Sequence, residues 1–104
     1  MKNKYGAELD RNGYAPSIMH DNGRCYSCGR TGSLQRHEVF GSAYRDRSKE
    51  FGLWVNLCPE CHHELHFQNA DKKLQLRKRG QREAMFWYGW STEEFRGLFG
   101  KNYL

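Results

Sequence analysis

The sequence lacks an apolar run of the roughly 20 residues that a membrane-spanning helix needs. Residues 1–6 place no apolar stretch behind their basic side chains, so no signal peptide is predicted there. Acidic residues are in deficit, with 12 against 17 lysines and arginines, which gives a formal net charge of +5. We therefore expect a cytoplasmic protein with no membrane contact, and the charge favours a polyanionic partner such as nucleic acid.

A chain of 104 residues is long enough for one domain but too short for two. Fifteen aromatic residues supply core material, although a domain of this size is often marginally stable without a cross-link. We expect one small α+β domain over residues 1–104. It is divided into a polar N-terminal arm (1–24), a core that holds every cysteine (25–67) and C-terminal helices (68–104).

Four cysteines form two Cys-x-x-Cys pairs, Cys25 with Cys28 and Cys58 with Cys61. Each pair can form a tight turn that presents two thiolates, and two such turns complete a tetrahedral zinc shell. Disulfides are disfavoured in a reducing compartment, and a redox Cys-x-x-Cys motif does not come as a matched pair. The pattern therefore predicts one structural zinc ion, whose binding also stabilises a small fold.

The segment between the two cysteine pairs is longer than the about 15–20 residues of a simple zinc ribbon. Residues 34–40 and 53–57 have the composition of strands, and a basic polar loop is expected over residues 44–50. The zinc ion is thus predicted to join the two ends of a β-hairpin that carries a long insertion.

Two helices are predicted after this core. The first covers residues 69–88, and Gly80 in its middle marks a point where it could kink or break. Ser91 and Glu94 have the spacing of a capping box for a second, short helix, which Gly100 ends.

Histidines gather around the second cysteine pair. His62 and His66 are four residues apart on an expected helix, so they share one face and can bind one ion. The competing interpretation gives one of them a hydrogen bond near the zinc ion and leaves the other in solvent. We favour metal binding because imidazole is a common metal ligand. Two other histidines are not expected to bind the ion. His20 is isolated and expected in solvent, and His63 is expected at the surface or behind the metal ligands.

Basic side chains form two clusters, one over residues 72–82 and one in the insertion. A solvated helix face and a DNA contact explain the first cluster equally well. The aromatic run over residues 86–90 could stack on bases, but core packing is favoured because a small chain needs the apolar area. The candidate nucleic-acid-binding residues are Arg45, Arg47, Lys72, Lys73, Arg77, Lys78, Arg79 and Arg82.

The order of these motifs resembles the HNH endonucleases of the His-Me finger superfamily. The similar strings lie at residues 36–41, 52–55 and 57–62, and His66 follows them. The ending at residues 99–104 also resembles small HNH proteins of bacteria and their phages. The resemblance implies a ββα-metal unit, treble-clef-like around its zinc ion, with helices added behind it.

The resemblance also implies a catalytic site in which His37, His62 and His66 hold a divalent ion, Mg, Mn or another. Many relatives carry His-His on the first strand where this chain has His37 followed by Glu38. Glu38 therefore takes the position of the general base, and the base stays open between Glu38 and a metal-activated water. An unperturbed carboxylate is a weak base, so Glu38 would need a desolvated setting.

The middle asparagine of the family marks a second departure. It is expected near Leu53, whereas Asn56 lies only two residues before Cys58. We predict a metal-dependent DNA endonuclease or nickase. The alternatives are a catalytically inactive HNH-fold zinc module that binds nucleic acid or a protein partner, and a purely structural zinc protein. No sequence pattern indicates an oligomeric state.

Overall fold

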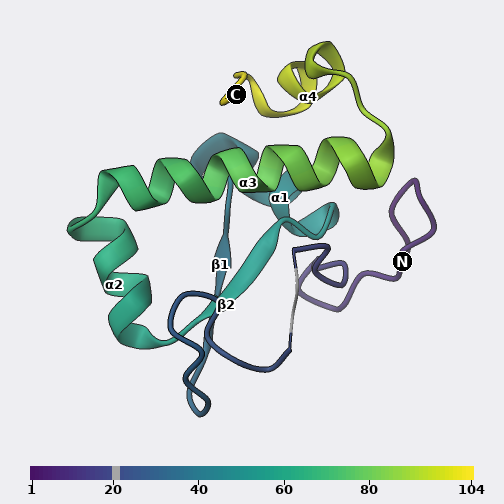
Figure 1. The fold of residues 1–104 in the computed structure, drawn as a ribbon. Coiled ribbons are helices and arrows are strands. Elements are labelled where there is room, and N and C mark those ends of the chain that lie inside the picture. The colour runs from purple at the N-terminus through teal and green to yellow at the C-terminus, as the bar shows by residue number, and fades with distance from the viewer. Residues whose placement is uncertain (20–21) are drawn as a thin grey trace.

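The computed structural model describes residues 1–19 and 22–104, so the expectation for His20 lies outside the described residues. The expected α+β class is confirmed by a two-stranded sheet and four α-helices in the described part of the chain (Figure 1). None of the described helices is long and apolar enough to cross a membrane. The elements are β1 (Gln35–Glu38), the 3-10 helix η1 (Ser42–Tyr44), α1 (Arg45–Glu50), β2 (Trp54–Leu57), α2 (Pro59–Phe67), α3 (Ala70–Tyr88) and α4 (Thr92–Phe99).

The two strands form the predicted antiparallel hairpin. His37 in β1 lies opposite Val55 in β2, and both side chains are buried. Each strand is shorter than the predicted residues 34–40 and 53–57, with four residues in each ladder. The sheet is thus a small platform, and the helices that follow it must supply most of the core.

The insertion between the strands is not the predicted loop. Most of residues 44–50 belong to α1, in which Asp46 in the first turn and Lys49 in the last turn both suit the helix dipole. The six residues of α1 have no apolar periodicity, so the sequence did not indicate a helix here. Ser48, fully buried, fixes it: its hydroxyl donates to the Leu53 carbonyl at 2.6 Å and accepts from the Phe40 amide at 3.2 Å.

The kink or break that the sequence allowed at Gly80 does not occur, and α3 runs unbroken through this position across the end of the hairpin (Figure 1). Gly80 is itself buried. A Cβ built on Gly80 would lie 3.0 Å from Val39 Cγ1 and 3.2 Å from Phe40 Cε2. The glycine therefore permits close packing of α3 on the residues that follow β1.

We expect Gly80→Ala to destabilise the fold by about 1–3 kcal/mol, the usual cost of overpacking a core. In an exposed helix the same change stabilises by about 1 kcal/mol. Here Val39 and Phe40 are 1% and 2% exposed and have little room to move. Urea unfolding measures the difference, with Gly97→Ala as the control because a Cβ there meets nothing within 4 Å. A stabilised Gly80→Ala protein would contradict the packing argument.

The C-terminal helix has the predicted ends. The Ser91 hydroxyl accepts from the Glu94 amide, the Glu94 carboxylate accepts from the Ser91 amide, and Gly100 ends α4 with φ of 77°. The tail beyond α4 returns to α3, where the fully buried Gln81 donates to Asn102 Oδ1 and accepts from the Tyr103 amide, each at 2.8 Å.

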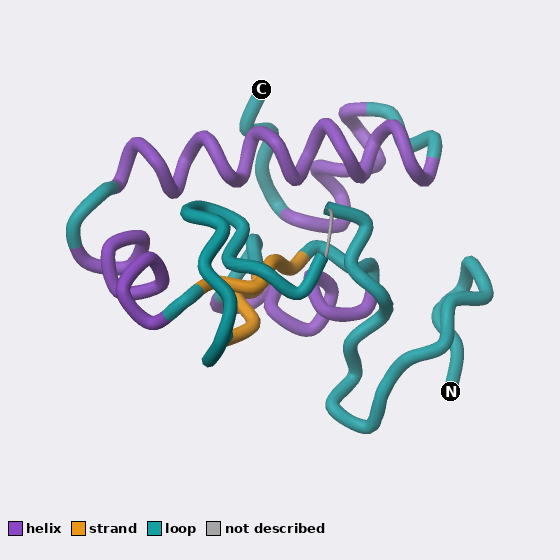
Figure 2. The backbone as a smooth tube through the Cα atoms, turned by 60° about the horizontal axis from the view of Figure 1, so that its bottom comes forward, coloured by secondary structure: helices purple, strands orange, loops and turns teal. Residues whose placement is uncertain are grey.

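The described residues of the arm, 1–19 and 22–24, form neither a helix nor a named strand, as predicted (Figure 2). Hydrogen bonds hold the arm to the hairpin and to α1. The Asn3 side chain donates to the Glu50 carbonyl at 2.8 Å. The Ser17 hydroxyl donates to the Trp54 carbonyl at 2.6 Å, and the Trp54 indole donates to the Ala15 carbonyl at 2.7 Å.

The prediction of core packing for the aromatic run holds for only part of it. Trp90 is 5% exposed, and Tyr88 packs against the core. Phe86 and Trp87 are 85% and 63% exposed, so core packing is wrong for these two side chains. At about 100° per residue, Phe86 points to the side of α3 opposite the buried Ala84, whereas Trp87 points about 60° from it, at the edge of the covered side.

Candidate metal centres

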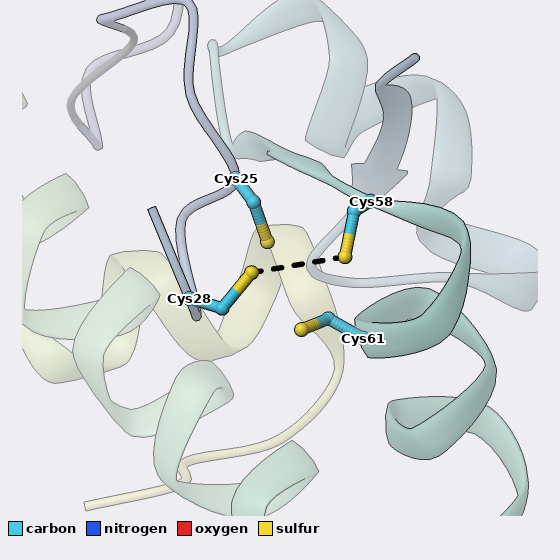
Figure 3. A group of neighbouring side chains, drawn as sticks. All are labelled: Cys25, Cys28, Cys58 and Cys61. Atoms are coloured by element: carbon cyan, nitrogen blue, oxygen red, sulfur yellow. Dashed lines mark hydrogen bonds between the residues drawn. The ribbon is translucent and has the colours of Figure 1, made fainter. Parts of the chain in front are cut away.

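The four cysteine side chains converge, as Figure 3 shows, with Cys25 and Cys28 on the loop before β1 and Cys58 and Cys61 at the start of α2. Their four sulfur atoms lie within 4.8 Å of one another, and Cys28 Sγ lies 3.8 Å from Cys58 Sγ. Zinc–sulfur bonds of about 2.3 Å in a tetrahedron separate neighbouring sulfurs by about 3.8 Å. All four cysteines are free thiols. They are therefore placed to bind one metal ion, and zinc fits their geometry.

Local hydrogen bonds form the two turns. In the first turn the Gly29 amide donates to the Cys25 carbonyl at 2.9 Å, and Gly29 has a φ of 79°, which favours glycine. In the second turn Cys58 is the N-cap residue of α2, and its carbonyl accepts from the His62 amide at 2.9 Å. These hydrogen bonds explain why a short Cys-x-x-Cys motif is sufficient to direct two sulfur atoms toward one point.

The surroundings of the thiols favour a bound cation. Burial opposes ionisation of Cys25, but backbone amides of Cys58, Cys28 and Ser27 outweigh it and lower the pKa of Cys25 to about 6. Burial and the neighbouring thiols raise the pKa of Cys61 to about 12. Several thiolates cannot share this space unless a positive ion compensates their charge, which zinc does.

The second cluster consists of three histidines, His37 from β1 and His62 and His66 from α2. One ring nitrogen of each lies within 4.8 Å of the other two. The Nε2 atoms of His62 and His66 are 3.0 Å apart, as their four-residue spacing on α2 predicted. The structure thus brings together the three histidines that the sequence singled out as ligands of one ion.

Hydrogen bonds leave ring nitrogens of this cluster available for an ion. His62 Nδ1 lies 2.6 Å from the side-chain oxygen of Gln35, which can only accept, so Nδ1 carries the proton and Nε2 keeps its lone pair. His37 Nε2 is buried and has no hydrogen-bond partner among the described residues. An orphaned buried nitrogen beside a half-buried imidazole, His62, and an exposed one, His66, is the arrangement that a bound metal ion would satisfy.

The protein keeps His37 and His62 neutral. Burial lowers the pKa of His37 to about 3, with contributions from His62, His66, Lys73 and Arg77. Burial and His66 also lower the pKa of His62. Because a metal ion binds neutral imidazole, both histidines are in the ligating form at neutral pH.

We expect the protein without an ion at this cluster to lose stability as the pH falls below 6.5, the ordinary pKa of histidine. The unfolded chain then binds a proton that folded His37 binds only near pH 3, so stability decreases toward acid in this window. The loss is at most about 1.4 kcal/mol per pH unit. Urea unfolding of the zinc-loaded protein should show a shallower pH dependence for His37→Gln between pH 6.5 and about 5. An equal pH dependence of stability in wild type and His37→Gln would contradict the assignment of this effect to His37.

The histidines open onto a pocket of about 470 Å³ at the junction of β1, α2 and α3. Lys73 and Arg77 from α3 line it together with Arg36 and Arg45. Asp10 pairs with Arg36 at 2.7 Å, whereas Lys73 has no ion-pair partner among the described residues. The pocket is therefore electropositive before any metal ion binds, which suits an anionic group.

Glu38 also lines this pocket, but its carboxylate is already engaged. One oxygen accepts from Arg45 Nε and the other accepts from the Tyr14 hydroxyl at 3.0 Å. The side chain is 9% exposed, so the carboxylate lies largely out of solvent. Glu38 would nevertheless have to release Arg45 before it could accept a proton from a substrate.

The donors in the cluster indicate which ion fits. Three imidazoles converge, and no carboxylate of the described residues joins their group. Imidazole suits Zn, Ni and similar transition ions, whereas Mg and, less strictly, Mn prefer oxygen ligands. Among the ions expected from the sequence, a transition ion is therefore favoured over Mg.

Two residues of the site were missed by the sequence analysis, Gln35 behind His62 and Tyr14 behind Glu38. Gln35 shares a strand face with His37, two residues away, and that alternation could have identified it. Tyr14 lies 24 residues from Glu38, and nothing local connects them. Asn56 was the candidate for the middle asparagine of the family. In the strand register Val55 lies opposite His37, and Asn56 lies opposite Arg36.

The predicted nucleic-acid-binding residues separate into groups. Arg45, Lys73 and Arg77 line the histidine pocket. The Arg47 guanidinium instead donates to the Leu98 carbonyl at 2.6 Å and ties α1 to α4. Lys78 lines neither this pocket nor the cleft on the other side of α3, whose lining basic residues are Lys72, Arg79 and Arg82.

Comparison of the chain with protein-family models, with curated proteins and with solved structures gave no match. The resemblance to HNH endonucleases therefore stays a prediction that rests on the motifs and on the geometry of the two clusters.

Proposed function

We propose that the cysteine cluster binds a structural zinc ion and that the histidine cluster binds a divalent ion for hydrolysis of DNA phosphodiester bonds, in the manner of an HNH endonuclease. One observation carries the proposal: three imidazoles converge within 4.8 Å at an electropositive pocket. Neutral ligands beside cations form a site for a metal ion and a phosphate together.

The residues of the pocket have separate roles in this proposal. His37, His62 and His66 hold the ion, and Gln35 fixes the ring of His62. A bound divalent ion supplies charge neutralisation at the scissile phosphate and stabilises the leaving oxygen. Lys73 and Arg77 hold phosphates of the DNA backbone, which gives salt-sensitive binding with little reading of sequence.

Nicking of supercoiled plasmid tests the function. Zinc-loaded protein is incubated with plasmid and with Mg, Mn, Ni or no added ion, and the zinc content is measured in each sample. We expect nicking with an added transition ion, weaker nicking with Mg, and none without an added ion. Absence of nicking under every condition, with folded zinc-loaded protein, would refute the proposal.

A second candidate is a catalytically inactive zinc module that binds nucleic acid. The contacts of Glu38 with Arg45 and Tyr14 favour it. Glu38 stands where the family has its general base, and here its carboxylate is already held by an ion pair and a hydrogen bond. This candidate predicts salt-sensitive DNA binding without cleavage, whereas a purely structural zinc protein shows neither.

A further inference from the structure

One side of α3 presents cations and aromatic rings together, away from the histidine pocket. Because successive residues of a helix are about 100° apart, these side chains fall within an arc of about 140° over about 22 Å of helix. Lys73 and Arg77, which line the histidine pocket, lie outside this arc. The side chains within this arc, called the outer face of α3, are Lys72, Gln75, Leu76, Arg79, Arg82, Glu83, Phe86 and Trp87.

The first half of the outer face borders a cleft of about 420 Å³ between α3 and the first cysteine turn. Its basic wall comes from the outer face itself, and its apolar floor includes Leu57, Leu65 and Tyr26. A cleft of this size accepts a small planar group, and the basic wall favours a ligand that carries negative charge next to it.

The cations of this face are available to an external anion. Arg82 has no ion-pair partner among the described residues. Arg79 pairs with Glu83 at 3.3 Å and Lys72 with Glu64 at 3.4 Å, but the two basic side chains are 60% and 42% exposed. Such surface pairs contribute at most about 1 kcal/mol, so a phosphate can replace the carboxylate without a large cost.

The second half of the outer face carries two rings that the core does not use. Phe86 and Trp87 are 85% and 63% exposed, although Tyr88 and Trp90 beside them pack inside. Exposed neighbouring aromatics at the end of a basic stripe match the two components of a single-strand binding surface, a cationic track and stacking platforms.

We propose that the outer face of α3 binds single-stranded nucleic acid, with phosphates on Lys72, Arg79 and Arg82 and bases stacked on Phe86 and Trp87. Duplex DNA keeps its bases stacked inside and offers them no partner. An acidic protein segment would match the cations but not the rings. The inference does not depend on the proposed hydrolysis, because none of these residues lines the histidine pocket.

Fluorescence anisotropy of a labelled single strand of about 12 nucleotides, titrated with zinc-loaded protein without any other divalent ion, tests the proposal. We expect Trp87→Ala to weaken binding about tenfold, the effect of losing one stacked base. Arg82→Gln should weaken binding and reduce the salt slope by about 0.7. Lys78→Gln is the matched control, because it removes the same charge from α3 outside the outer face.

Tryptophan fluorescence gives a second readout that charge alone does not produce. Of the three tryptophans, Trp54 and Trp90 are 4% and 5% exposed, so a base can stack only on Trp87. We expect the single strand to quench the emission of wild-type protein and to leave that of Trp87→Ala unchanged.

Several results would overturn the proposal. The single strand could fail to bind, or a duplex of the same sequence could bind with equal affinity. Lys78→Gln could weaken binding as much as Arg82→Gln. Finally, polyglutamate at the same charge concentration could displace the strand. The last result would assign the face to acidic protein segments instead.

Discussion

Replacing Cys58 with serine is expected to abolish the cooperative thermal unfolding of this chain and its zinc content. Cys58 is 1% exposed and caps α2 beside the other three sulfurs. Structural zinc contributes about 10–16 kcal/mol of apparent binding free energy, which equals or exceeds the whole stability of a typical domain, about 5–15 kcal/mol. A sheet of two four-residue strands cannot replace that contribution.

Circular dichroism during heating, with zinc measured on the same samples, checks this expectation. Glu60→Gln is the matched control, since Glu60 lies in the same turn and pairs with Arg30 at the surface without belonging to the cysteine cluster. It should keep its zinc and melt within a few degrees of wild type, because an exposed ion pair contributes at most about 1 kcal/mol. A Cys58→Ser protein that melts cooperatively near the wild-type temperature would show that the cysteine cluster is not what stabilises the fold.

Replacing His62 with alanine is expected to lower plasmid nicking by about 100-fold or more while the zinc ion and the fold remain. His62 supplies the nitrogen that lies 3.0 Å from His66 Nε2, and its ring is fixed from behind by Gln35. A metal ion contributes several kcal/mol of charge stabilisation, and about 2.7 kcal/mol corresponds to 100-fold in rate. The side chain is partly exposed on α2, so its loss leaves little cavity in the core.

His63→Ala is the control for this experiment. His63 is exposed on the same helix, contacts Phe67 at 4.9 Å between ring centroids, and does not belong to the histidine cluster. Initial nicking rates of the three proteins at several concentrations of Mn or Ni separate lost metal affinity from lost turnover. Equal loss in both variants, or no loss in His62→Ala, would remove His62 from the proposed site.

The features that the sequence predicted depend on neighbours along the chain. Two cysteine turns, the His62–His66 spacing and the capping box of Ser91 and Glu94 are each encoded within five residues, and the structure contains all of them. The hairpin that brings the cysteine pairs together was also predicted, because the strands that flank the insertion have apolar patterns.

Features that depend on distant parts of the chain were missed. Gly80 looked like a kink because helix propensity ignores Val39 and Phe40, which pack where its side chain would be. Phe86 and Trp87 looked like core residues because hydrophobicity does not reveal which face of α3 is already covered. The pairing of Glu38 with Tyr14 joins the arm to the hairpin across 24 residues, and it bears directly on the identity of the base.

The proposed function requires that this chain hold two different metal ions, one on the cysteines and one on the histidines. Elemental analysis after dialysis of zinc-loaded protein against Ni tests it most directly. One zinc and one nickel per chain are expected in wild type, and one zinc without nickel in His62→Ala. Wild type that retains no nickel, or His62→Ala that retains as much as wild type, would contradict the histidine metal site.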